Sequence, residues 1–277
     1  MMSNQNESGN RLVSVITPTY NSAKFIGETI ESVLAQTYTN WEMVIVDDCS
    51  SDETVRIVKE YVAGDNRIKL IQLKENSGPA IARNTAIEHA CGRYLAFLDS
   101  DDQWLPHKLE RQLQFMQEHE IAFSFTDYMN MNEDGTETGV VTHAPKEANY
   151  HQLLKHNTIG CLTVMLDTEK TGKVKMINIR TRQDYVLWLT ICKQGFTAYG
   201  LQEVLANYRN VGNSVSNNKL KMAKQNWKVY RQIENISLVK SLWYFVHYVY
   251  FKLKKYVSQK VGRPSNKYSE KQRRQYE

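Results

Sequence analysis

The residues best suited to chemistry are three closely spaced aspartates, Asp99, Asp101 and Asp102. They follow directly on the apolar run 93–98, Arg-Tyr-Leu-Ala-Phe-Leu, which predicts a buried strand. Carboxylates crowded at the end of a buried strand repel one another and lose hydration. A divalent cation bound to oxygen ligands and to a phosphate-bearing substrate would offset that repulsion. The alternative is a solvated acidic turn that caps a helix beginning at Pro106.

The first half of the chain supplies the elements that would position this cluster. Short β-rich apolar runs alternate with amphipathic segments of helical length. That alternation predicts an α/β fold with a mostly parallel sheet and helices on both of its faces. The predicted strands are residues 12–17, 43–46, 68–73, 94–98 and 121–125, and the predicted helices are residues 22–36, 52–62, 79–89 and 106–118.

Two further polar clusters follow predicted strands in the same way. Residues 19–21 follow the first strand, and Asp47-Asp48 follow the second. Parallel strands end at one edge of the sheet, where such sheets bind ligands. The alternative is that each cluster caps a helix, but a cap needs only one Asx or Ser residue. The surplus aspartates therefore favour a binding site over helix caps. The candidate cap residues are Asn21, Ser22, Ser50, Ser51, Asp52, Asp102 and Gln103.

The second half of the chain is less regular. We expect a hairpin turn at Asp134-Gly135 and a helix over residues 182–194. Other expected features are a strand near 162–166, a loop over 170–181, two short strands within 197–208 and a flexible polar loop over 210–218. The predicted organisation is a disordered N-terminus (1–11), one α/β domain (12–215), a C-terminal helical region (216–257) and a basic flexible tail (258–277).

Five segments, in order, resemble the family 2 glycosyltransferases. They are VITPTYN (15–21), VDDCSSDET (46–54), NSGPAIARN (76–84), YLAFLDSDD (94–102) and QDY (183–185). The resemblance covers about residues 12–210 and extends to bacterial enzymes of cell-surface polysaccharide synthesis, particularly of the teichuronic acid type. It implies the GT-A fold, a Rossmann-like architecture, and inverting transfer of a sugar from a UDP-sugar to a hydroxyl. The implied acceptor is a lipid-linked glycan.

The resemblance also implies a pocket for uracil. Asp48 would accept a hydrogen bond from the imide N–H of the base, with Asp47 beside it, because a carboxylate is a pure acceptor. Tyr20 would stack on the base, and Thr17 or Thr19 would line the pocket. The alternative for Tyr20 is a packed core aromatic residue.

The diphosphate would be bound next to the acidic cluster. Asp99-Ser100-Asp101 matches the DxD motif of the family, which implies Mn²⁺ or Mg²⁺ bound by Asp101, with Asp99 on the ribose or on metal-bound water. The resemblance also implies that Ser100 contributes to nucleotide binding. Arg83, near a helix N-terminus, would bind the phosphate groups. The alternative is a salt bridge to an aspartate of the cluster. Asp102 is either part of this site or a first-turn helix residue.

Asp184 is the expected catalytic base. Direct displacement needs a carboxylate that deprotonates the acceptor hydroxyl, and the resemblance places it in an acidic-Asp pair on a helix. Gln183 replaces the first acidic residue here. The alternative for Asp184 is a first-turn cap or an ion pair with Arg180 or Arg182. Two alternative functions stay open: a non-catalytic sugar-nucleotide-binding or scaffold protein, which Gln183 favours, and a sugar nucleotidyltransferase.

The composition predicts the class of protein and its cellular compartment. With 42% hydrophobic and 23% charged residues, the 277-residue chain is typical of a globular protein. Its four scattered cysteines predict free thiols in or near the core of a cytoplasmic protein, without a zinc site. The polar start predicts no signal peptide, and the longest apolar run, residues 242–251, is shorter than the roughly 20 residues of a spanning helix.

The C-terminal segment differs in charge from the body. Residues 236–277 contain ten Lys and Arg against two Asp and Glu, a net charge of +8, so the rest of the chain is at −3. Apolar residues recur every three or four positions over 236–257, which predicts an amphipathic helix. Such a helix is expected to lie on the anionic inner face of the cell membrane. The alternative is that it docks on the catalytic domain or on a partner chain. The sequence contains no base-reading module, so nucleic acid is not a predicted partner. The stripe is Val239, Leu242, Trp243, Val246, Val249, Tyr250, Leu253 and Tyr256.

Overall fold

The computed structural model describes residues 11–212 and 219–260. The expectations for the N-terminus, for the basic tail and for most of the 210–218 loop lie outside these residues. The strands are β1 (Val13–Thr19), β2 (Trp41–Asp47), β3 (Ile68–Gln72), β4 (Tyr94–Phe97), β5 (Gln103–Trp104), β6 (Phe123–Met131), β7 (Glu137–Thr142), β8 (Glu147–Ala148), β9 (Met165–Asp167) and β10 (Ala198–Arg209). The helices are α2 (Ile26–Leu34), α3 (Thr54–Gly64), α4 (Pro79–His89), α5 (Lys108–Glu118), α6 (Tyr150–Lys155), η1 (Cys161–Thr163), α7 (Thr168–Thr171), α8 (Gln183–Lys193), α9 (Lys219–Lys228), η3 (Val229–Ile233) and α10 (Leu238–Lys260).

The described strands form one sheet in the order β3-β2-β1-β4-β9-β6-β10-β5, with β7 paired to β6 and β8 to β10. β1 is parallel to β2 and β4, β2 is parallel to β3, and β6 is parallel to β10. β9 runs antiparallel between β4 and β6 and joins the two parallel groups. The predicted α/β sheet is confirmed, and its second half mixes parallel and antiparallel pairs.

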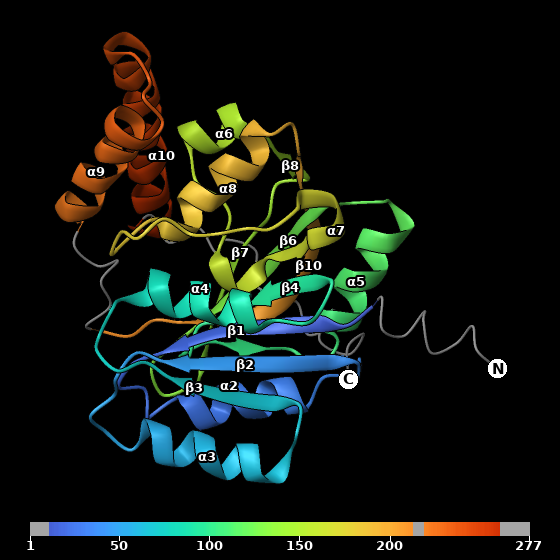
Figure 1. Ribbon diagram of the computed structural model, residues 1–277. Helices are drawn as coiled ribbons and strands as arrows, with labels where there is room; N and C mark the ends of the chain where they lie inside the picture. Colours follow the sequence, from blue (N-terminus) through green and yellow to red (C-terminus); the bar gives the residue numbers. More distant parts are fainter. Residues whose placement is uncertain (1–10, 213–218, 261–277) are drawn as a thin grey trace.

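Helices cover both faces of the sheet (Figure 1). In β2, Val44 and Val46 pack into the core shared with α4 and α8. Met43 and Ile45, which point the other way, pack into the core shared with α2, α3 and α5. Strands buried on both faces read as continuous apolar runs, which is why their positions were predictable.

Two details of the sequence prediction were wrong. Residues 197–208 do not form two short strands, because β10 is one strand of 12 residues with two register shifts against β6. The four cysteines are free as predicted, but Cys49 and Cys91 are exposed rather than near the core.

The predicted C-terminal amphipathic helix is confirmed as α10, which stands beside α6 and α9 (Figure 1). One face, with Ser241, Tyr244 and Tyr248, is buried, and the Tyr244 hydroxyl is hydrogen-bonded to His151 of α6 at 2.8 Å. The predicted apolar stripe, from Val239 to Leu253, is on the other face. Among the described helices, none is long and apolar enough to span a membrane. The exposed apolar residues of α10 are Leu238, Val239, Leu242, Trp243, Val246, Val249, Tyr250 and Leu253.

Candidate functional site

The three polar clusters lie at one edge of the sheet, as the alternation of strands and helices predicts. Thr19 and Asp47 are paired residues at the ends of β1 and β2, and the Asp48 N–H donates to the Thr19 carbonyl at 2.8 Å. The end of β4 lies on the other side of β1, since Phe97 pairs with Ile16. The loops that follow the three strands are therefore neighbours.

Hydrogen bonds join these loops to one another. The Ser51 N–H donates to Asn21 Oδ1 at 2.8 Å, and the Asn21 N–H donates to Ser50 Oγ at 2.9 Å. The hydroxyls of Ser22 and Ser100 are 2.7 Å apart, which connects the loop after β1 to the acidic cluster. Residues far apart in sequence thus form one rigid edge.

The alternative role of these clusters as helix caps is mostly wrong. Neither α2 nor α5 has a side-chain cap at its N-terminus. Asp102 is not a first-turn residue either, because β5 follows it and α5 begins only at Lys108. The Asp52 carboxylate accepts the Thr54 N–H at 3.0 Å at the start of α3, but the residue that precedes α3, Glu53, provides no side-chain cap either.

Asp47 and Asp48 are both buried and shape the loops around them. Ser50 donates to both oxygens of Asp47, from its N–H at 2.9 Å and from its hydroxyl at 2.5 Å. Asp48 accepts one backbone N–H at each oxygen, from Ser77 at 2.7 Å and from Gly78 at 2.8 Å. Because a carboxylate offers about four lone-pair positions, Asp48 keeps acceptor capacity for a ligand.

The end of β1 carries two hydroxyls without partners. Thr17 Oγ1 and Thr19 Oγ1 are buried and form no hydrogen bond within residues 11–212 and 219–260. A buried hydroxyl without a partner is costly, so this pair suits a site that accepts a polar ligand. Tyr20, next in the chain, is 50% exposed, and its prediction as a packed core residue is therefore wrong.

Arg83 on α4 forms a salt bridge to the acidic cluster, with Nη2 2.5 Å from Asp99 Oδ1. This was one of its two predicted roles. Burial opposes the charge of Arg83, but the Asp99 carboxylate, followed by Cys161 and Asp184, raises its pKa above the ordinary value. In the part of the chain that the structure describes, Nε and Nη1 are buried and have no hydrogen-bond partner. The guanidinium is therefore a fixed cation with donors to spare.

The remaining aspartates of the cluster repel one another. Burial, together with the charge of Asp99, raises the pKa of Asp101 to about 6. Burial, together with the charges of Asp101 and Asp99, raises the pKa of Asp102 well above its usual range. Among the described residues, no three His, Cys, Asp or Glu side chains converge as a metal site. A cation here would therefore need further ligands from a substrate.

Asp184 lies in the first turn of α8 and is partly exposed. Its charge acts on both Arg83 and Cys161, so the structure brings it close to the Arg83–Asp99 pair. In the described part of the chain, the predicted ion pair with Arg182 is not formed. The Arg182 guanidinium instead reaches the Tyr248 hydroxyl of α10, at 3.5 Å.

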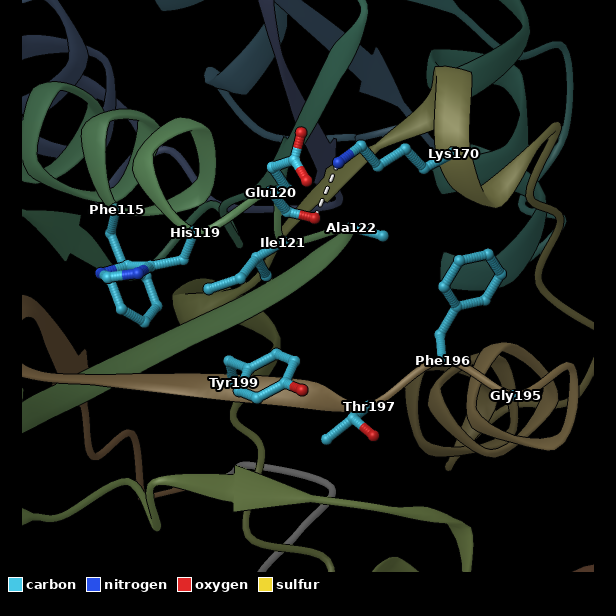
Figure 2. Close-up of a pocket in the computed structure, with 10 residues that line it drawn as sticks. All are labelled: Phe115, His119, Glu120, Ile121, Ala122, Lys170, Gly195, Phe196, Thr197 and Tyr199. Atoms are coloured by element: carbon cyan, nitrogen blue, oxygen red, sulfur yellow. Dashed lines mark hydrogen bonds between the residues drawn. The ribbon is translucent and has the colours of Figure 1, made fainter.

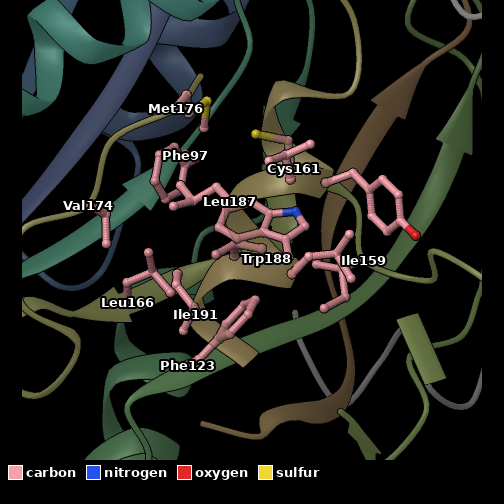
Figure 3. Close-up of a cluster of buried hydrophobic side chains, with 14 of the residues drawn as sticks. Phe97, Phe123, Ile159, Cys161, Leu166, Val174, Met176, Leu187, Trp188 and Ile191 are labelled. Atoms are coloured by element: carbon pink, nitrogen blue, oxygen red, sulfur yellow. The ribbon is translucent and has the colours of Figure 1, made fainter. Parts of the chain in front are cut away.

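Trp188, one turn after Asp184, anchors the helix in the core (Figure 3). Its side chain is fully buried, with its ring 5.5 Å from that of Phe97 and 5.2 Å from that of Phe123. Phe97 is the last residue of β4, immediately before Leu98 and the acidic cluster. The same packing therefore positions the carboxylate of Asp184 and the end of β4.

Arg209, at the end of β10, is a site residue that sequence reasoning missed. Its backbone N–H donates to Asp102 Oδ1 at 2.8 Å, and its Nε donates to the Asp101 carbonyl at 2.8 Å. The only local signal is a basic residue at the end of an apolar strand.

A cavity of about 560 Å³ lies at the opposite edge of the sheet, near the starts of β6 and β10 (Figure 2). The rings of Phe115, Phe196 and Tyr199 line it, and Lys170 reaches the Glu120 carbonyl at 2.7 Å. No predicted site residue belongs to it.

Comparisons with known proteins agree with this geometry. The family model for "Glycosyl transferase family 2" matches residues 14–205. A Bacillus subtilis (strain 168) protein assigned to teichuronic acid biosynthesis, the glycosyltransferase TuaG, is 54% identical over 244 residues, covering 88% of this chain and 97% of TuaG. The Escherichia coli UDP-Glc:alpha-D-GlcNAc-diphosphoundecaprenol beta-1,3-glucosyltransferase WfgD is 39% identical over 246 residues, covering 88% of this chain and 95% of WfgD.

Solved structures support the GT-A fold. S. aureus TarS (residues 1–349) in complex with UDP-GlcNAc has a TM-score of 0.66 at 24% identity, covering 80% of this chain and 65% of that chain. Mannosyltransferase PcManGT from Pyrobaculum calidifontis in complex with GDP-Man and Mn²⁺ has a TM-score of 0.62 at 19% identity, covering 81% and 64%. The sequence relatives decide against a sugar nucleotidyltransferase and against a non-catalytic protein. The chain is a glycosyltransferase and belongs to glycosyl transferase family 2.

Proposed function

We propose that this enzyme transfers a sugar, with inversion, from a UDP-sugar to a hydroxyl of a lipid-linked glycan in cell-surface polysaccharide synthesis. One observation carries the proposal: Asp99 in the loop after β4, the strand beside β1, pairs with Arg83, and the charge of Asp184 also acts on Arg83. A nucleotide bound at this edge of the sheet would have its sugar near the carboxylate of Asp184.

The donor would lie along the carboxyl edge of the sheet. Tyr20 is exposed and available to stack on the base, and Asp48 has acceptor capacity for the imide N–H of uracil. Thr17 and Thr19 would donate their unpartnered hydroxyls. WfgD, which this chain resembles over most of its length, is named for UDP-Glc and a diphosphoundecaprenol-linked acceptor, which supports both substrate classes.

The acidic cluster suits Mn²⁺ or Mg²⁺. Asp101 would be the direct ligand, since burial and then the charge of Asp99 raise its pKa, and a bound cation would offset both. Asp99 forms a salt bridge with Arg83 and would contact the ribose or a metal-bound water. When bound together with the donor phosphates, the cation would neutralise charge that develops on the leaving group. The free Nε and Nη1 donors of Arg83 would bind the same phosphates.

Asp184 would act as the general base. Its first-turn position on α8 faces the Arg83 side of the site, and its carboxylate is partly exposed, so an acceptor hydroxyl can reach it. Removing the hydroxyl proton on the side opposite to the leaving phosphate leads to direct displacement and inverts the anomeric carbon.

The acceptor class suggests a location at the membrane. We propose that α10 lies on the anionic cytoplasmic face of the cell membrane. Its exposed face combines Trp243 and other apolar residues with Lys240, Lys252 and Lys254. Apolar side chains flanked by lysines are what an interfacial helix needs.

A thermal-shift panel tests the donor site. UDP, GDP, CDP and NAD would each be added to wild type and to Asp101→Asn, with Mn²⁺ or with EDTA. We expect stabilisation by UDP that depends on Mn²⁺ and is lost in the variant; a ligand at 100 times its Kd contributes about 2.7 kcal/mol. Stabilisation by NAD alone, or by none of the four nucleotides, would contradict the proposal.

A further inference from the structure

Arg209 is distant in sequence from every predicted site residue, yet it contacts the loop that follows β4. Its guanidinium is 1% exposed, and its donors reach three other segments of the chain. Nε donates to the Asp101 carbonyl at 2.8 Å, Nη1 to the Glu133 carbonyl at 2.9 Å, and Nη2 to Glu28 Oε2 at 2.5 Å. The Phe25 ring lies 4.9 Å from the guanidinium carbon. The side chain therefore has one available position.

The contacts of Arg209 with this loop lie on the C-terminal side of the Asp101 side chain. Besides the Asp101 carbonyl, Arg209 holds the next residue, since its backbone N–H donates to Asp102 Oδ1 at 2.8 Å. The Thr29 hydroxyl donates to the Asp102 carbonyl at 2.8 Å, which fixes the same loop from α2. On the N-terminal side, the Ser100 hydroxyl lies 2.7 Å from that of Ser22, so Arg209 completes the fixing of the backbone that carries the Asp101 carboxylate.

We propose that Arg209 is the positioning residue of the metal-binding loop: it fixes the backbone of Asp101 so that the carboxylate is oriented for a divalent cation. This role rests on the metal site proposed above. Lysine cannot replace arginine there, because an ammonium has no planar fork with which to reach Asp101, Glu133 and Glu28 together.

The test compares Arg209→Lys with wild type in two titrations. The first measures the affinity for Mn²⁺ at saturating UDP, from the electron paramagnetic resonance signal of free Mn²⁺. The second measures UDP affinity in EDTA by calorimetry. We expect Mn²⁺ affinity to fall about 10- to 100-fold, the usual cost of losing an outer-shell partner of a metal ligand. UDP affinity in EDTA should be unchanged.

Arg93→Lys is the matched control. Arg93 bridges Asp167 and Glu169 at the start of β4, the end opposite to the acidic cluster. Its substitution should lower the Tm without changing Mn²⁺ affinity. If Arg209 were merely structural, Arg209→Lys would behave in the same way, and that result would overturn the proposal, as would an equal loss of Mn²⁺ and UDP affinity.

Glu28→Gln is the second variant, in case Arg209→Lys does not fold. Glu28 is 51% exposed and contacts Arg209, and it also accepts a hydrogen bond at 2.7 Å from Gln103, just after the loop, so its loss should weaken Mn²⁺ binding in the same direction by a smaller factor. Wild-type Mn²⁺ affinity in a folded Glu28→Gln, with Arg209→Lys unfolded, overturns the positioning role. A wild type that binds neither UDP nor Mn²⁺ overturns the proposed function itself, and this outcome is recognised before any variant is made.

Discussion

Arg83 Nη2 lies 2.5 Å from Asp99 Oδ1, and the two partners differ sharply in exposure. The Arg83 side chain is 7% exposed, whereas that of Asp99 is 32% exposed. The salt bridge therefore joins a cation that water hardly reaches to an anion that water hydrates. Which partner is removed should decide how much stability is lost.

In EDTA, we expect Asp99→Ala to lower the free energy of unfolding by about 3 kcal/mol, because it leaves the buried Arg83 charge unpaired. Arg83→Met should cost about 1–2 kcal/mol, because Asp99 stays hydrated. Urea denaturation measures both values. The double variant should cost less than the sum of the two. Equal losses in the single variants would show that exposure does not govern this pair.

Asp184→Asn should lower kcat by about 10²- to 10⁴-fold, the range expected for loss of a general base. The carboxylate is partly exposed and outside any side-chain cap, so the Tm and the affinity for UDP should stay at wild-type values. Turnover is measured as UDP release with a donor and an acceptor on which the wild type is active, and the search for them starts from the UDP-Glc and GlcNAc-diphosphoundecaprenol named for WfgD. Asp65→Asn, placed just before β3, is the control. Full turnover in Asp184→Asn would exclude the residue as the base.

Trp188→Ala should destabilise the protein by about 3–5 kcal/mol, since it opens a cavity against Phe97 and Phe123. Trp188→Phe should cost clearly less, because the indole Nε1 has no hydrogen-bond partner to lose. Guanidinium denaturation of both variants checks this order. If the packing of Trp188 also positions Asp184, Trp188→Phe should reduce kcat while it leaves UDP affinity intact.

Glu42 predicts a pH dependence of stability. Burial opposes its ionisation, but Lys69, the Ser14 hydroxyl and the Cys91 N–H together lower its pKa below the ordinary 4.5. A lowered pKa in the folded state contributes stability that is present above pH 4.5 and is lost as the pH falls through the folded value.

Glu42→Gln should therefore be less stable than wild type by about 1–3 kcal/mol at pH 7, the range for hydrogen bonds to a charged group. The difference should shrink below pH 4.5. Urea denaturation across this range measures it. A difference that is constant with pH would mean that the charge of Glu42 contributes nothing.

The exposed stripe of α10 predicts binding to anionic vesicles. Leu242→Asp and Trp243→Asp should each weaken co-sedimentation with phosphatidylglycerol vesicles by about tenfold or more, since burying such a side chain contributes about 1.5–3 kcal/mol. Added salt should weaken wild-type binding too. Leu220→Asp on α9, also exposed, is the control and should bind as wild type does. Equal binding by all four proteins would exclude α10 as the membrane contact.

Some of the site follows from sequence order alone. Thr19 and Asp47 end β1 and β2, and Asp99 follows β4; all three strands are part of a β-α-β alternation, and the carboxyl ends of parallel strands must meet at one edge. Local pattern therefore predicted which side chains would be neighbours. Asp184 was harder to place, because it follows an irregular stretch, and only the family resemblance pointed to it.

The contacts of Arg209 could not be predicted from local sequence patterns. Its contact with Asp102 spans 107 positions and requires β10 to pair beside β6, which no short-range signal encodes. The role of Asp102 stayed open for the same reason: as a carboxylate before a helical pattern it resembles a cap, and its partner Arg209 lies 107 positions further along the chain.

The sequence by itself determined the strand and helix order, the edge of the sheet at which the polar clusters meet and the family, because periodicity and short motifs are local properties. Only the tertiary structure decided that Arg83 pairs with Asp99, that Trp188 is core and that the stripe of α10 stays exposed. Those outcomes depend on which buried surfaces meet, and a buried charge or ring takes its role from neighbours that the chain supplies from elsewhere.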